Sequence, residues 1–173
     1  LIMACGTGKT FVSLWVKERI SAQSTLVLVP SLSLLSQALR EWTFAAKEPF
    51  DVLCVCSDKT VVKKSVQDEL IESVHDVPFP VKSDIEEIRE FLKKSAPKVI
   101  FSTYHSSPLI VEAQSDEKTP SFDLAIADEA HRCTGDRDGM YATVLDDSRI
   151  KSKTLVHILA KAYAHYNYIR EID

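Results

Sequence analysis

A polar segment with two glycines follows a short apolar stub and precedes an amphipathic stretch. It consists of Cys5, Gly6, Thr7, Gly8, Lys9 and Thr10. A loop of this composition between a strand and a helix presents successive backbone N–H groups to phosphate oxygens, and the helix N-terminus attracts the same anions. Lys9 can reach the β- and γ-phosphates of ATP, and the Thr10 hydroxyl can ligate Mg²⁺. The segment therefore predicts a phosphate-binding loop.

One position departs from the general phosphate-loop pattern. That pattern has glycine five residues before Gly8, where this sequence has Met3. The alternative interpretation is an ordinary glycine turn that happens to precede Lys9. Two observations favour the phosphate loop: its place at a strand-to-helix junction, and an acidic segment further along the chain that could complete a cation site.

The acidic segment is Asp128-Glu129-Ala130-His131, directly after the apolar run at residues 124–127. Ligands of α/β sheets bind at the carboxyl ends of the strands, so Asp128 should emerge at the same edge as the phosphate loop. We expect Asp128 to hold Mg²⁺ through water and Glu129 to orient and deprotonate the attacking water. His131 joins this catalytic set as a residue that couples the site to neighbouring loops. An acidic pair that merely caps the next helix is the alternative.

The elements that must position these residues alternate along the chain. Apolar runs predict strands at residues 1–3, 25–29, 52–56, 99–102, 124–127 and 154–159. Amphipathic stretches predict helices at residues 9–20, 32–44, 83–94 and 106–114. Ser31 can cap the second helix, and Ser83-Asp84-Ile85-Glu86 fits a capping box for the third. This alternation predicts an α/β fold with a mainly parallel sheet and helices on both faces.

Composition limits the functional classes. The chain has 173 residues and a formal net charge of −4, so a nucleic-acid site would have to be local rather than a basic face. No apolar run has the roughly 18 residues of a membrane span. The four cysteines have no zinc-site spacing, and Cys54 and Cys56 would share one face of a strand. We expect a cytoplasmic protein with reduced cysteines and no membrane partner.

Four segments together carry a family likeness. They are residues 3–10 (MACGTGKT), 26–37 (LVLVPSLSLLSQ), 99–107 (VIFSTYHSS) and 122–135 (FDLAIADEAHRCTG). In this order they resemble the first RecA-like domain of superfamily 2 DEAH-box helicases. The likeness is strongest to the branch with type III restriction subunits and UvrB-like helicase domains. It implies a RecA-like P-loop NTPase fold, the cofactors ATP and Mg²⁺, and DNA, double-stranded, as a partner.

The resemblance also implies nucleic-acid contacts. Pro30 and Ser31, with the helix N-terminus that follows, would contact the DNA backbone, and Ser102, Thr103 and Tyr104 would lie on the same side. Hydroxyls and N-terminal amides bind phosphate without net positive charge. The alternatives are an ordinary helix cap at Ser31 and simple loop packing for Tyr104.

The end of the sequence departs from the family pattern. Family members carry a Ser/Thr-Ala-Thr segment that couples hydrolysis to movement, and the aligned residues 159–162 lack both hydroxyls. We interpret residues 1–160 as the ATP-binding domain, with an insertion at 57–80, an N-terminus that lacks part of the first strand, and an atypical tail at 161–173. The second RecA-like domain, which would supply arginine fingers, is missing from this sequence.

Three functional hypotheses follow. The first is an ATP-hydrolysing motor domain of a DNA helicase or translocase from a restriction or defence system. The second is a truncated or decayed nucleotide-binding fragment without motor activity. The third, an unrelated P-loop kinase or GTPase, is disfavoured because the sequence has neither an arginine-rich lid nor an Asn-Lys-x-Asp guanine reader.

Overall fold

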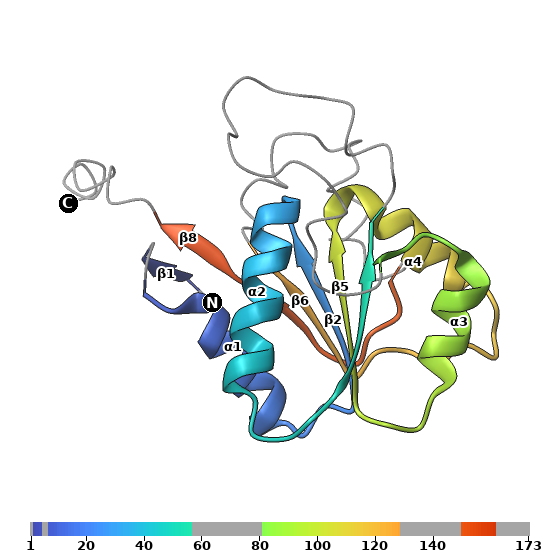
Figure 1. Ribbon diagram of the computed structural model, residues 1–173, viewed down its shortest axis with the longest axis horizontal. Helices are drawn as coiled ribbons and strands as arrows, with labels where there is room; N and C mark the ends of the chain where they lie inside the picture. Colours follow the sequence, from blue (N-terminus) through green and yellow to red (C-terminus); the bar gives the residue numbers. More distant parts are fainter. Residues whose placement is uncertain (1, 5–6, 57–80, 129–149, 162–173) are drawn as a thin grey trace, which may run out of the picture.

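A computed structural model describes residues 2–4, 7–56, 81–128 and 150–161. The strands are β1 (Ile2–Ala4), β2 (Ser24–Val29), β3 (Asp51–Val55), β4 (Val81–Lys82), β5 (Lys98–Thr103), β6 (Leu124–Ala127), β7 (Leu155–His157) and β8 (Leu159–Lys161). The helices are α1 (Lys9–Arg19), α2 (Leu32–Ala45), α3 (Ile85–Lys93) and α4 (Ser107–Ala113), with a 3₁₀ turn at Tyr104–Ser106 before α4. They form three layers, with the sheet in the middle (Figure 1).

The sheet is parallel throughout the described residues. Six strands pair in the order β4-β3-β5-β2-β6-β7, and β1 pairs with β8 in a second, two-stranded sheet. A single residue, Ile158, separates β7 from β8, and its N–H donates to the Ala127 carbonyl at 2.8 Å. The segment from Leu155 to Lys161 therefore pairs first with β6 and then with β1. One strand was predicted at residues 154–159, and the structure divides it at Ile158 because the pairing partner changes there.

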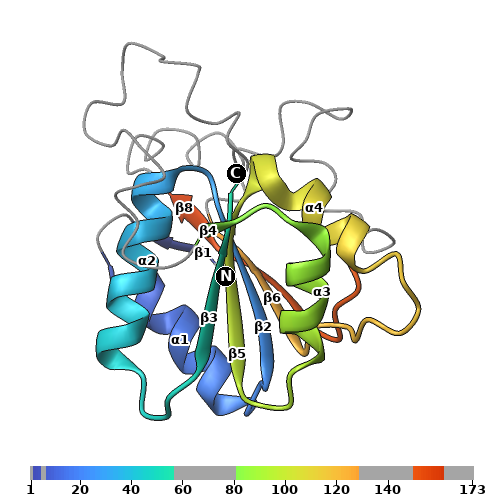
Figure 2. The same ribbon diagram turned by 45° about the vertical axis from the view of Figure 1, so that its right-hand side comes forward.

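Both faces of the sheet are covered, as predicted. Strand β2 is buried along its whole length, with Leu26 and Leu28 on the face covered by α3 and α4, and Val27 and Val29 on the face covered by α1 and α2. A continuous apolar run is the pattern of a strand buried on both sides, because successive side chains point to opposite faces. Figure 2 shows the two helix pairs on either side of the strands.

The N-caps of two helices match the sequence signals to different degrees. Ser31 caps α2 as predicted, its Oγ accepting from the Leu34 amide at 3.4 Å. The cap of α3 is Asp84 and not Ser83, so the predicted capping box is wrong. The Asp84 carboxylate accepts from the Glu86 and Glu87 amides at 2.9 and 3.1 Å. A carboxylate satisfies two orphan amides at once and also favours the positive end of the helix dipole.

The two cysteines at residues 54 and 56 are confirmed to share one face. Both are buried free thiols in the core below α1 and α2. Burial raises the pKa of Cys54 to about 12 and that of Cys56 to about 11, so both are protonated at neutral pH. In the part of the chain that the structure describes, no helix is long and apolar enough to cross a membrane.

Candidate nucleotide site

Gly8 begins α1 in a backbone conformation that favours glycine. Its φ of +79° and ψ of 32° are left-handed, and it is the N-cap residue of the helix. A Cβ built on Gly8 would meet only the Phe11 Cδ2 atom within 4 Å, at 3.8 Å. Space is therefore available, and the requirement for glycine is conformational, since a left-handed residue with a side chain costs roughly 1–2 kcal/mol. The turn places Lys9 and Thr10 at the helix N-terminus.

The first turn of α1 is held by a tryptophan of α2. The Thr10 carbonyl accepts from the Ser13 hydroxyl at 2.6 Å and from the indole N–H of Trp42 at 3.0 Å. Trp42 is fully buried, and its ring packs edge-on against Phe101 of β5, with centroids 5.5 Å apart. The position of Lys9 and Thr10 is thus fixed from the core beneath α2. This contact was not predicted from the sequence. A buried indole N–H needs a hydrogen-bond acceptor, but the sequence pattern does not show which group accepts.

Asp128 is held from two neighbouring strands. It follows β6, and its N–H donates to the Leu28 carbonyl of β2 at 2.9 Å. Its carbonyl accepts from the phenolic hydroxyl of Tyr104 at 2.6 Å. Tyr104 belongs to the turn after β5, and β2 lies between β5 and β6. The carboxyl-terminal part of β2 and the turn after β5 therefore both hold the Asp128 main chain. Asp128 itself is half-buried.

The structure locates part of the predicted site. Gly8, Lys9 and Thr10 follow the carboxyl end of β1, and Asp128 follows the carboxyl end of β6. The strand segment from Leu155 to Lys161 pairs with both β6 and β1, so the two groups lie at the same edge of the parallel strands. Thr7 is described and exposed. Four predicted site residues lie outside the described residues, namely Cys5, Gly6, Glu129 and His131.

The five candidate nucleic-acid residues divide by burial. Pro30 and Ser31, between β2 and α2, are partly exposed. Ser102, Thr103 and Tyr104 are each at most 1% exposed. For Tyr104, burial favours the alternative of loop packing.

The hydroxyls of the buried candidates bond within the chain. The Ser102 hydroxyl donates to the Thr103 carbonyl at 3.1 Å, and the Thr103 hydroxyl lies 3.1 Å from that of Ser106. These bonds stiffen the turn after β5. A contact between nucleic acid and this turn would therefore have to use main-chain groups or exposed atoms of the turn. Pro30 and Ser31, in contrast, have accessible groups.

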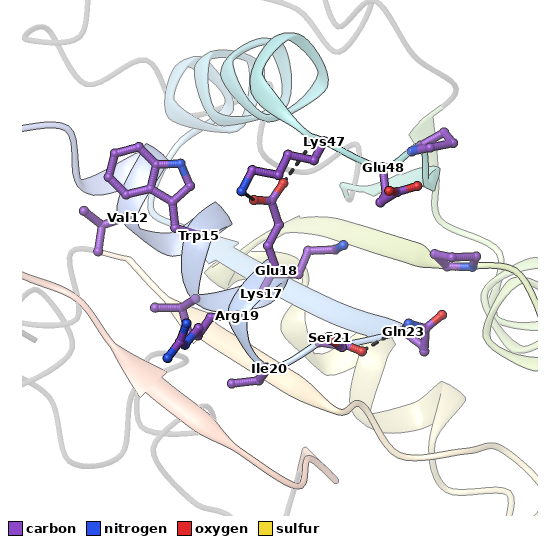
Figure 3. A pocket seen from close by; sticks show the side chains of 14 residues that line it. Val12, Trp15, Lys17, Glu18, Arg19, Ile20, Ser21, Gln23, Lys47 and Glu48 are labelled. Carbon is purple, nitrogen blue, oxygen red and sulfur yellow. Dashed lines mark hydrogen bonds and ion pairs between the residues drawn. The ribbon is translucent and has the colours of Figure 1, made fainter.

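A groove lies along α1, toward the end opposite Gly8. It has a volume of about 1260 Å³ and extends from Trp15 past the end of α1 to Gln23 and Pro97 (Figure 3). On its wall, a Glu18 carboxylate oxygen accepts from the Lys47 amide at 2.9 Å. The groove adjoins the amino ends of β2, β3 and β5, so it is separate from the carboxyl edge that carries Gly8 and Asp128.

The parallel sheet with helices on both faces is the fold of a RecA-like helicase domain. The helicase domain of Pyrococcus furiosus Hef has the same fold, with a TM-score of 0.53 over 93% of this chain and 29% of that chain at 21% identity. The family model described as "Type III restriction enzyme, res subunit" matches residues 1–160, and the chain belongs to this family.

Relatives of the chain are helicases and restriction enzymes. It is 32% identical over 136 residues to a probable helicase of African swine fever virus, covering 79% of this chain and 14% of the viral protein. The DNA-bound Type ISP restriction-modification enzyme LlaBIII matches with a TM-score of 0.74 at 32% identity, over 91% of this chain and 11% of that one. A nuclease-deletion mutant of the Type ISP enzyme LlaGI, in complex with a DNA substrate mimic, matches with a TM-score of 0.70 at 32% identity. The match covers 91% of this chain and 13% of that one. The chain thus spans about a seventh or less of these proteins.

Proposed function

We propose that this chain binds Mg²⁺-ATP and hydrolyses it as the first motor domain of a DNA helicase or translocase of a restriction or defence system. The observation that carries the proposal is the common edge of Gly8, Lys9 and Thr10 with Asp128, in a chain of a helicase family. A magnesium nucleotide requires an ammonium group for its phosphates and a hydroxyl and a carboxylate for its metal, and all three are found at one edge of a parallel sheet.

Each residue has a distinct proposed role. The amides at the start of α1 and the Lys9 ammonium group bind phosphate oxygens, and Thr10 and Asp128 hold the metal, Asp128 through water. Glu129 orients the attacking water and accepts its proton, and His131 couples the site to neighbouring loops. Mg²⁺, when bound, neutralises charge that develops on the phosphate oxygens.

The proposed partner is double-stranded DNA. The support is that the two related restriction enzymes are described as bound to DNA or a DNA mimic. Pro30 and Ser31 would contact phosphates, together with the amides at the start of α2. With a net charge of −4, the chain would rely on such local donors.

A substitution of the phosphate-loop lysine tests the nucleotide site. Lys9→Ala should weaken Mg²⁺-ATP binding at least 10-fold in calorimetry, because it removes the positive charge that is proposed to contact the phosphates. The matched control is Lys93→Ala, since Lys93 lies at the end of α3, on the other face of the sheet. Unchanged affinity in the Lys9 variant, with both variants folded, would contradict the phosphate-loop assignment.

The second candidate is a nucleotide-binding domain without motor activity. The observation that favours it is the sequence of β8, Leu-Ala-Lys, which has no hydroxyls, whereas the resemblance to helicases implies a hydroxyl-bearing coupling segment at these residues. Phosphate release measured with and without duplex DNA separates the two candidates. A rate that rises with DNA and depends on Lys9 supports the motor domain, whereas binding without DNA-stimulated hydrolysis supports the alternative.

A further inference from the structure

Tyr104 crosses the end of a central strand to reach the acidic segment. Its hydroxyl donates to the Asp128 carbonyl at 2.6 Å, although Tyr104 follows β5 and Asp128 follows β6. The intervening strand is β2, which ends at Val29. The Tyr104 side chain is almost completely buried. A hydrogen bond in such an environment is electrostatically stronger than one in water, so it restrains the acceptor well.

The acceptor is the main-chain carbonyl of Asp128, the first residue of the proposed catalytic pair. The Asp128 carbonyl belongs to the peptide unit that joins Asp128 to Glu129, and because a peptide unit is planar, a bond to its oxygen restrains the orientation of the whole unit. The Asp128 N–H is held in turn by the Leu28 carbonyl at 2.9 Å. The main chain is therefore fixed on both sides of the Asp128 Cα atom.

The donor is itself held firmly. Residues Tyr104–Ser106 form a 3₁₀ turn that leads into α4, and the hydroxyls of Thr103 and Ser106 lie 3.1 Å apart across it. The ring of Tyr104 packs in the core beneath α3 and α4. The hydroxyl is thus a preorganised donor, which is the property required of a group that positions a catalytic carboxylate.

We propose that Tyr104 is a positioning residue for ATP hydrolysis, acting through the main chain of Asp128 and touching neither nucleotide nor metal. The inference rests on the proposed function. It assigns to Tyr104 a role different from the nucleic-acid contact that its sequence context predicts. Misplacement of a catalytic group by about 1 Å can cost 10²-fold in rate, so loss of the bond should act on turnover more than on binding.

The test is Tyr104→Phe, which removes only the hydroxyl. We expect kcat for ATP hydrolysis to fall about 10-fold, while KM and the calorimetric Kd for Mg²⁺-ATP change less than about 2-fold. The matched control is Ser107→Ala. Ser107 lies three residues away, and its buried hydroxyl has no hydrogen-bond partner among the described residues. This control should leave kcat, KM and Kd unchanged.

The outcomes separate this inference from the proposed function. If kcat is unchanged in Tyr104→Phe while hydrolysis still depends on Lys9, the positioning role is wrong and the proposed function stands. A fall in kcat that only follows the loss of folded protein, measured by circular dichroism at the assay temperature, also overturns it. If Lys9→Ala neither weakens binding nor slows hydrolysis, both proposals fail.

Discussion

Replacing Trp42 with phenylalanine should lower the free energy of unfolding by about 2–3 kcal/mol. The indole N–H donates to the Thr10 carbonyl, and loss of such a bond costs about 1 kcal/mol. The carbonyl keeps the Ser13 hydroxyl as a second donor, so it is not left unsatisfied. The smaller ring also leaves a cavity and loosens the edge-on contact with Phe101, which adds about 1–2 kcal/mol.

The chain provides its own control, since its second tryptophan is Trp15, which is 57% exposed on α1. Trp15→Phe should change the stability by no more than about 0.5 kcal/mol. Each variant keeps a single indole, so urea unfolding can be followed by tryptophan fluorescence and checked by circular dichroism. In thermal unfolding, a loss of 2–3 kcal/mol corresponds to a decrease in Tm of roughly 4–12 °C. Equal stabilities of the two variants would show that Trp42 does not anchor the first turn of α1.

Two further predictions concern a carboxylate and the helix caps. The hydrogen bond from Lys153, together with backbone amides, lowers the pKa of Asp123. The ionised Asp123 carboxylate therefore stabilises the fold above the unfolded-state pKa of about 3.9. This stabilisation is lost as the pH falls through the folded-state pKa. Asp123→Asn should therefore flatten the decline of stability in acid; urea midpoints from pH 7 to 2.5 measure this, and parallel profiles would contradict it. In urea unfolding, Asp84→Ala should cost about 1 kcal/mol of stability and Ser31→Ala about 0.5 kcal/mol. Asp84 caps two amides, at 2.9 and 3.1 Å, whereas Ser31 caps one, at 3.4 Å. A larger loss in the Ser31 variant would contradict the cap assignments.

Elements with a strong local signal could be predicted from the sequence. The strand at Leu124–Ala127 is confirmed to the residue. Polar residues on both sides of the apolar run mark where the strand begins and ends. Helix α1 was predicted at residues 9–20 and ends one residue earlier, at Arg19. It was also predictable that Gly8 and Asp128 follow the carboxyl ends of strands, since parallel strands present these ends together.

Features that depend on distant residues could not be predicted. The bond from Trp42 to Thr10 joins residues on two helices, and the burial of Tyr104 depends on how α3 and α4 cover the sheet. The break at Ile158 reflects a change of pairing partner, which an apolar run does not encode. Helix α1 illustrates the same limit, because the large apolar side chain of Trp15 lies within the amphipathic stretch that predicted the helix and yet is exposed.

The pairing of β1 with β8 has a consequence for how the site assembles during synthesis. Strand β1 is the first strand in the sequence and β8 is the last strand that the structure describes, with Ile2 paired to Leu159. A contact with so large a sequence separation forms late, because the loop-closure entropy must be offset before the pairing becomes favourable. The glycine loop leaves the ribosome long before the partner of its strand does. We therefore expect nascent chains arrested before Leu159 to leave β1 without this partner, so that the proposed binding of nucleotide would report the formation of the β1–β8 pair.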